Sequence, residues 1–268
     1  PYLDRAVKKE KDFVDGRGNA RPSGNDAHGT ACAGIIFSRS ARVAGLAPEL
    51  SLVAARIAKS DSQGFWIFDD WLTADAIDWC WDDAQADVLS NSWGGGPPVD
   101  IIARALDRAR TRGRNRKGAV IVAAAGNSQN LVEFPANLEE VLTVGASNQW
   151  DERKTRTSRD GETWWGSNYG DSLDLLAPGV GIRTTDIRGR RGYAGGMFTD
   201  DFNGTSAAAP FVAAVAGMII AVNSGLSEAE VRDLINRTTD PLSGGGWNRT
   251  VGYGRLNAYA ALRAARCA

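Results

Sequence analysis

Short apolar segments alternate along this chain with segments whose apolar residues recur every three or four positions. Continuous apolar runs predict buried β-strands at residues 51–57, 88–93, 119–125, 141–146 and 173–177. Helical spacing or capping signals predict helices at residues 69–83, 99–112, 227–237 and 257–265. Strands that alternate with helices in this way indicate an α/β fold, with a mostly parallel sheet covered by helices on both faces.

One further segment, residues 205–222, is apolar on every side and predicts a helix that is buried all round. Gly204 precedes it, and Pro210 is expected in its first turn, where no backbone donor is lost. Ser206 then lies near the helix N-terminus, where free N–H groups suit a nucleophile with oxyanion donors beside it. The alternative interpretation is that Ser206 only caps the helix.

The composition excludes several classes of protein. The 268 residues suit a single domain over residues 1–268, and 31 basic against 32 acidic residues predict no nucleic-acid partner. The longest apolar stretch, residues 207–222, is interrupted and short for a membrane span, and residues 1–5 have no signal-peptide pattern. Three cysteines (Cys32, Cys80 and Cys267) and one histidine predict neither a disulfide scaffold nor a zinc site.

Two other segments carry candidate chemistry. His28 stands at the head of an Ala- and Gly-rich segment, residues 26–36, whose composition suggests a helix packed closely on its neighbours. Asn127 follows a predicted strand in an Ala-Gly-Asn sequence, where its amide is well placed to donate to an oxyanion. Taken singly, His28 could equally be a structural histidine, and the Gly-Asn pair an ordinary turn.

The order of these motifs matches a known arrangement. His28-Gly29-Thr30 is followed by residues 43–48 (VAGLAP), 90–94 (SNSWG), 125–127 (AGN), 204–210 (GTSAAAP) and 251–257 (VGYGRLN). In this order and at these intervals, the motifs make the chain resemble the subtilisin-like serine proteases, the subtilase family. The resemblance covers nearly the whole chain and implies the three-layer subtilisin-like fold.

The resemblance also implies an activity and the residues that carry it. We expect a serine endopeptidase in which Ser206 is the nucleophile, His28 the general base, and Asn127 an oxyanion donor beside the Ser206 N–H. The expected partner is an extended polypeptide substrate. Its cleft would be formed by one edge at Ser92, Trp93, Gly94 and Gly95, a facing edge at Ser62, Gln63 and Gly64, and a pocket wall that includes Ala125 and Gly126.

The catalytic aspartate of the family has no counterpart in the expected place. Subtilases order their triad Asp, His, Ser. Asp4, Asp15 and Asp26 precede His28, but none of them follows an apolar strand-like run. In the family register the aspartate and its strand fall before Pro1. We therefore expect an N-terminal fragment of the same protein, or an upstream stretch, to carry the aspartate. The alternatives are a catalytically inactive peptide-binding protein and, with Asp151 to Tyr169 as its only candidate insertion, a subtilase-type peptide ligase or macrocyclase.

Three smaller expectations complete the interpretation. Residues 37–43, from Phe37 to Val43, hold two arginines and no carboxylate, so no calcium is predicted there and no cofactor is required, although calcium elsewhere stays possible. Cys32 lies one helical turn after His28 and is expected to be a small core residue; the alternative is a thiol whose modification disturbs His28. Family resemblance favours an extracytoplasmic or secreted location.

Overall fold

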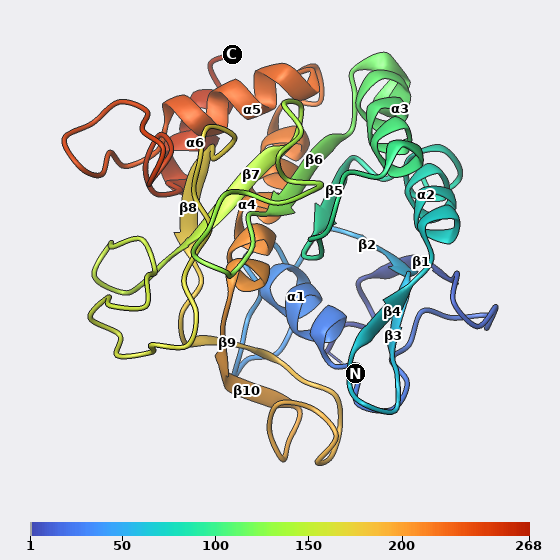
Figure 1. The fold of residues 1–268 in the computed structure, drawn as a ribbon. Coiled ribbons are helices and arrows are strands. Elements are labelled where there is room, and N and C mark those ends of the chain that lie inside the picture. The colour runs from blue at the N-terminus through green and yellow to red at the C-terminus, as the bar shows by residue number, and fades with distance from the viewer. Residues whose placement is uncertain (1) are drawn as a thin grey trace.

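The computed structural model describes residues 2–268, and a four-stranded parallel sheet lies at its centre (Figure 1). Its strands stand in chain order, β5 (Val88–Asn91), β6 (Val120–Ala124), β7 (Leu142–Ser147) and β8 (Leu175–Pro178). All four were predicted from apolar runs, and their ends differ from the predicted ends by up to two residues. The expected α/β fold is therefore confirmed.

Alternating side chains of β6 divide the core between the two faces of the sheet. Val120 and Val122 pack with α4 (Thr205–Val222), whereas Ile121 and Ala123 pack with α2 (Asp70–Asp78) and α3 (Asp100–Arg116). These strand residues are at most 2% exposed, and full burial of an aliphatic side chain contributes about 1.5–3 kcal/mol. Helices α5 (Glu228–Arg237) and α6 (Ala258–Ala265) complete the layer around α4.

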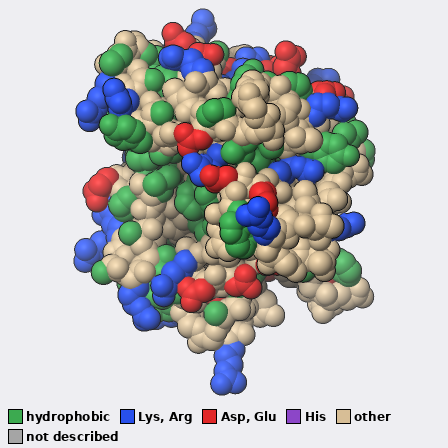
Figure 2. Space-filling view, turned by 90° about the vertical axis from the view of Figure 1, so that its left-hand side faces the viewer, with side chains coloured by type: hydrophobic (Ala, Val, Ile, Leu, Met, Phe, Trp, Pro, Cys, Tyr) green, Lys and Arg blue, Asp and Glu red, His purple; other side chains and the backbone are tan. Residues whose placement is uncertain are grey.

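Helix α4 is the central helix, and it contacts all four strands of this sheet. Within residues 2–268 it is the one helix long and apolar enough to cross a membrane by length and composition, and 67% of that segment is buried inside the protein. Its position in the core accounts for its apolar composition. Figure 2 shows basic and acidic side chains interspersed on one face of the surface around this core.

A second parallel pair of strands stands apart from the central sheet. Strand β1 (Val7–Asp12) pairs with β2 (Leu52–Arg56), and no hydrogen bonds join β2 to β5. A cavity of about 1650 Å³ is lined by residues of both β2 and β5, by Ile36 and by Ala213. The same cavity extends to His28 and Ser206. One edge of each of these two strands therefore faces open space instead of a neighbouring strand.

Smaller elements surround this framework. Helix α1 (His28–Phe37) packs on α4 and on β9 (Ile182–Thr185), which pairs with β10 (Phe198–Phe202). Strands β3 (Ala58–Ser60) and β4 (Trp66–Phe68) form a hairpin, and α2 continues into a π-helical turn, η1 (Trp79–Asp83). The apolar patterns had not predicted β1, β3, β4, β9 or β10.

Residues 151–169, the candidate insertion named above, form a long loop that is partly buried. Lys154 and Trp165 in this segment are fully buried. The Lys154 ammonium donates to the carbonyl groups of Thr155, Glu162 and Trp165, and it pairs with Asp160 at 3.0 Å. The segment has no regular strand or helix, but it closes around an internal cation and packs as part of the protein body.

Candidate active site

Ser206 is the second residue of α4, so the predicted position at a helix N-terminus is confirmed. Gly204 caps the helix at φ +117°, a backbone conformation that residues with side chains rarely adopt. Pro210, by contrast, is the sixth helical residue and not part of the first turn. Because Pro210 has no N–H, the carbonyl group of Ser206 lacks its usual helical partner.

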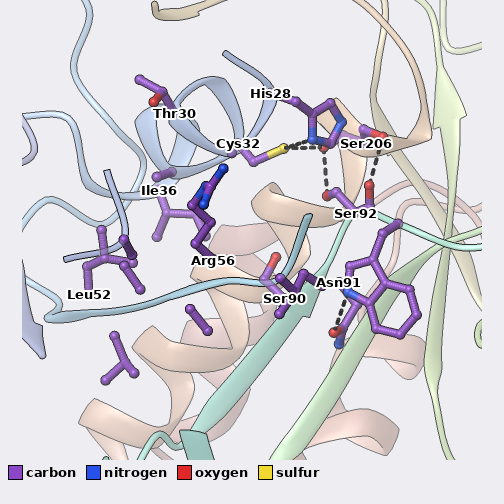
Figure 3. A pocket seen from close by; sticks show the side chains of 18 of the residues that line it. His28, Thr30, Cys32, Ile36, Leu52, Arg56, Ser90, Asn91, Ser92 and Ser206 are labelled. Atoms are coloured by element: carbon purple, nitrogen blue, oxygen red, sulfur yellow. Dashed lines mark hydrogen bonds between the residues drawn. The ribbon is translucent and has the colours of Figure 1, made fainter. Parts of the chain in front are cut away.

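Side chains outside α4 replace that missing partner (Figure 3). The Ser92 hydroxyl donates to the Ser206 carbonyl at 3.0 Å, and the Cys32 thiol donates to it at 3.5 Å. The Ser206 hydroxyl in turn donates to the carbonyl oxygen of Ser92 at 3.3 Å. The proline therefore ties the candidate nucleophile to the segment that follows β5.

His28 begins α1 and lies beside Ser206 in the same cavity (Figure 3). Its ring stands edge-on to Trp66 at 5.8 Å and to Phe202 at 5.7 Å between centroids. Its Nδ1 atom is 3.9 Å from the Cys32 sulfur. Burial lowers the pKa of His28 to about 4, because these apolar surroundings disfavour the charged imidazolium.

Asn127 follows β6 and is held in one orientation by Thr205. Its Oδ1 atom accepts from the Thr205 N–H at 2.8 Å and from the Thr205 hydroxyl at 3.0 Å. The same hydroxyl accepts from the N–H of Gly126 at 3.1 Å. These bonds leave the Asn127 amide NH₂ group without a partner among residues 2–268, next to the N-terminus of α4.

No carboxylate within residues 2–268 is hydrogen-bonded to His28. Asp15 and Asp26 bond instead to Arg56, Lys59 or Ser60. Asp12 is an additional aspartate that the apolar patterns did not single out; it ends β1, and it pairs with Arg17 and Arg56. These pairings hold the pKa of Asp12 at about 2 despite its burial.

Some of the other predicted substrate residues line the cavity and others do not. Ser92, Trp93, Gly94 and Gly95 follow the end of β5 and line the cavity, as Gly126 does. Ala125 is fully buried behind that wall. The Ser62-Gln63-Gly64 segment forms the exposed turn of the β3–β4 hairpin, and none of its residues lines the cavity. The hairpin contributes Trp66 and Phe68 to the lining instead.

Three contributing residues were missed from sequence: Thr205, Trp66 and Arg56. Thr205 stood directly before the proposed nucleophile, so its position was a usable signal. Trp66 and Arg56 gave no such signal, because their roles depend on a hairpin and a strand pair that bring distant segments together. Cys32 was predicted as a core residue; it packs among apolar residues and also contacts Ser206 and His28. Its burial raises the pKa of the thiol to about 12.

The side chains of residues 37–43, where no calcium is predicted, do not suit a bound cation. Arg39 donates to the carbonyl group of Pro48 and pairs with Glu49, while Arg42 lies over the Phe198 ring. Two guanidinium groups repel a hard cation, and residues 37–43 offer it no carboxylate. Within residues 2–268, no group of three or more His, Cys, Asp or Glu side chains converges on a possible metal position.

Comparison with known proteins gives one consistent result. A family model described as "Subtilase family" matches residues 3–254. The chain is 35% identical to a thermophilic serine proteinase of Bacillus sp. (strain AK1) over 98% of its length, which is 58% of that relative. It is 33% identical to thermitase of Thermoactinomyces vulgaris, covering 98% of this chain and 84% of thermitase.

A solved structure supports the fold. A protease from Pseudoalteromonas arctica superposes with a TM-score of 0.79 at 24% identity, covering 98% of this chain and 86% of that one. The subtilisin-like architecture inferred from the motifs is therefore confirmed. Together with the family match over residues 3–254, these relationships show that the chain belongs to the subtilase family of serine proteases.

Proposed function

We propose that the chain is the main part of a serine endopeptidase that cleaves extended polypeptides through an acyl-enzyme. The observation that supports this most directly is that three groups with suitable chemistry line the same cavity. The Ser206 hydroxyl, the His28 ring and the free amide of Asn127 come from α4, α1 and the end of β6, and they meet at one cavity.

In this mechanism the Ser206 oxygen attacks the carbonyl carbon of the substrate while His28 takes the hydroxyl proton. The negative charge that forms on the substrate oxygen is stabilised by the Asn127 amide and by the backbone N–H of Ser206. His28 then returns the proton to the leaving amine as the peptide C–N bond breaks. Water repeats the sequence on the acyl-enzyme, which releases the acid and restores Ser206.

The hydroxyl of Ser206 must change its hydrogen bond for this to begin. It now donates to the carbonyl group of Ser92. A rotation toward His28 would replace that acceptor with the imidazole nitrogen. Substrate that occupies the cleft beside Ser92 would favour the rotation by competing for the same segment, a β-augmentation mode of binding.

We further propose that an extended segment of the same protein occupies the cavity between β2 and β5 and brings the catalytic carboxylate. Both strands have an edge facing this cavity, and unpaired backbone groups at an edge readily accept another strand. The segment would come from an upstream stretch or an associated N-terminal fragment. A carboxylate near Nδ1 would orient the His28 ring and stabilise its charged form.

Two measurements on the purified protein test these proposals. We expect a fluorophosphonate probe to label Ser206, as mapped by mass spectrometry, and we expect Ser206→Ala to abolish both labelling and peptide hydrolysis. Intact-mass and N-terminal sequencing should reveal the additional segment. Folded protein that binds an extended peptide but leaves Ser206 unlabelled would contradict the protease proposal and support the peptide-binding alternative.

The ligase alternative concerns the fate of the acyl-enzyme. A peptide ligase passes the acyl group to an amine, so it joins peptides where a protease releases acids. Product analysis with an added amine nucleophile distinguishes the two outcomes. The structure offers one candidate shield against water, the compact segment 151–169, but no residue of that segment lines the cavity.

The remaining proposals concern the domain, the location and the cofactors of the enzyme. We propose that residues 1–268 form one catalytic domain and that the protein acts outside the cytoplasm, as its family membership favours. A relative of 33% identity from Trichormus variabilis is named a calcium-dependent protease. Calcium is therefore worth testing by chelation, although residues 37–43 are unsuited to hold it. We propose no required cofactor.

A further inference from the structure

Arg56 ends β2, and its side chain is only 5% exposed. One terminal nitrogen donates to both carboxylate oxygens of Asp12, at 3.1 and 3.0 Å, and to Asp15 at 2.8 Å. The other donates to the Ser23 hydroxyl at 2.8 Å and lies 3.6 Å from Asp26. A buried charge is tolerated only with such partners, so this arrangement fixes the residues around it.

Asp26 connects this network to the candidate general base. It stands two residues before His28, and the residue between them, Ala27, gives α1 no side-chain cap. The Asp26 carboxylate accepts from the Ser23 hydroxyl at 3.1 Å and from the backbone N–H of Ser60 at 3.0 Å. The start of α1 is therefore held through Asp26 rather than by its own N-cap.

The hydrogen bond from Ser60 also connects Asp26 to His28 through the β3–β4 hairpin. Ser60 ends β3 and is the direct cross-strand partner of Trp66 in β4. The Trp66 ring stands edge-on to the His28 ring at 5.8 Å. Asp26 is thus connected to His28 in two ways: along the chain through Ala27, and through the hydrogen bond to Ser60, the Ser60–Trp66 strand pair and the Trp66–His28 ring contact.

We propose that Arg56 is a positioning residue: by holding Asp26, it fixes the His28 ring and the Trp66 wall of the cleft relative to each other. No ring contact joins the guanidinium to His28 or Trp66; it reaches Asp26 directly at 3.6 Å and through the hydroxyl of Ser23. Displacement of a catalytic group by about 1 Å can cost about 10²-fold in rate. The proposal rests on the proposed function only in naming His28 as the base, because the positioning itself is measurable without catalysis.

The single histidine of the chain makes the test direct, because its imidazole gives one set of NMR signals. We expect the folded protein to show a cross-peak between the His28 ring and the Trp66 indole. In Arg56→Gln this cross-peak should weaken or split. The value of kcat for peptide hydrolysis should fall at least about tenfold, with a smaller change in KM.

Arg17→Gln is the matched control. Arg17 also pairs with Asp12, at 2.7 Å, but it contacts neither Asp26 nor Ser60. We expect this variant to keep the cross-peak and kcat. Asp26→Asn in the Arg56→Gln background should restore the cross-peak, because it removes the uncompensated charge and keeps an oxygen for the Ser60 N–H. If Arg56→Gln alone does not fold, Arg56→Lys takes its place, because it keeps the charge and loses the forked guanidinium donors; it should also weaken or split the cross-peak.

An Arg56→Gln protein that keeps both the cross-peak and kcat would overturn the proposal. The same conclusion follows if Arg17→Gln and Arg56→Gln weaken the cross-peak equally, since loss of Asp12 pairing would then explain both. Wild-type protein without protease activity but with a cross-peak that depends on Arg56 would contradict the proposed function alone. The two failures are therefore distinguishable.

Discussion

At the scale of single residues, the position of the candidate nucleophile depends on a proline four residues further along α4. Pro210 leaves the Ser206 carbonyl without a helical N–H, and Ser92 and Cys32 supply donors in its place. Thr205 similarly donates both its backbone N–H and its hydroxyl to the side-chain amide oxygen, Oδ1, of Asn127. Ser206 and Asn127 are thus held in place by hydrogen bonds from Ser92, Cys32 and Thr205.

Asn127→Ala tests the amide as an oxyanion donor. We expect kcat to fall by about 10²–10³-fold with little change in KM, because the donor acts on charge that forms only in the transition state. Steady-state hydrolysis of a chromogenic peptide measures both constants. Asn130→Ala, a nearby exposed asparagine, is the control and should leave them unchanged. An unaltered kcat in Asn127→Ala would sink the assignment.

In residues 1–268 alone, without the carboxylate that we propose to lie near Nδ1, His28 predicts a dependence of stability on pH. Its folded-state pKa of about 4 lies below the unfolded value of 6.5, so the unfolded chain binds the proton more readily. The contribution of His28 is complete above pH 6.5, and it is lost as the pH falls from there through 4. Denaturant titrations at several pH values should show this loss, and His28→Asn should lack it. NMR titration of the ring near its ordinary pKa would contradict the prediction.

At the scale of elements, α1 approaches β9 closely enough to require a glycine. A Cβ atom at Gly34 would stand 2.2 Å from the Thr185 hydroxyl and 2.4 Å from that of Thr184. Both hydroxyls already donate to carbonyl groups of α1, at Thr30 and Ala31. Helix α1 is therefore held against β9 by hydrogen bonds that a larger residue at position 34 would disrupt.

Gly34→Ala should accordingly lower the free energy of unfolding by about 1–3 kcal/mol, the usual cost of an overpacked contact. Gly29→Ala, on the same helix but with nothing within 4 Å of its Cβ position, is the control. It should be neutral or stabilising by up to about 1 kcal/mol, because alanine favours the helix. Thermal or urea unfolding measures the free energy of unfolding of both variants. Equal changes in the two variants would show that helix propensity, and not the contact with β9, determines the effect.

The segment around Lys154 gives a second test at this scale. Lys154→Met leaves three carbonyl groups and the Asp160 carboxylate without their cation, so we expect a loss of about 3–5 kcal/mol. Limited proteolysis should then cut within residues 148–169. Arg159→Met removes an exposed pair with Glu152 and should change stability by less than about 1 kcal/mol. Resistance of Lys154→Met to proteolysis would contradict this account.

Sequence patterns predicted the elements whose burial is uniform and missed those whose partners are distant. Strand β6 is apolar throughout and was found, whereas β1 reads Val-Lys-Lys-Glu-Lys-Asp and is a strand only because β2 pairs with it. The positions of Ser206, His28 and Asn127 followed from ordered motifs. The buried ammonium of Lys154 could not be foreseen, because a charged residue in a polar segment normally faces water.

At the scale of the whole molecule, the strands beside the cavity have fewer neighbouring strands than those in the middle of the four-stranded sheet. Strands β6 and β7 each have a neighbour on both sides and are almost entirely buried, whereas β2 and β5 each have one neighbour. Hydrogen exchange should therefore be slowest in β6 and β7 and markedly faster at the amides of β2. Binding of an extended segment in the cavity should slow the β2 and β5 amides. Equal protection of β2 and β7 in the chain alone would contradict this ordering.

The two strand edges beside the cavity also bear on how the chain behaves among copies of itself. An unpaired strand edge can pair with any extended chain nearby, including another copy of this chain. During synthesis and refolding, the chain is consequently exposed to pairing with other copies while the edges of β2 and β5 stay open. Yield, colloidal stability and shelf life should therefore fall as the protein concentration rises. A segment bound in the cavity should reduce this aggregation, because it would cover both strand edges.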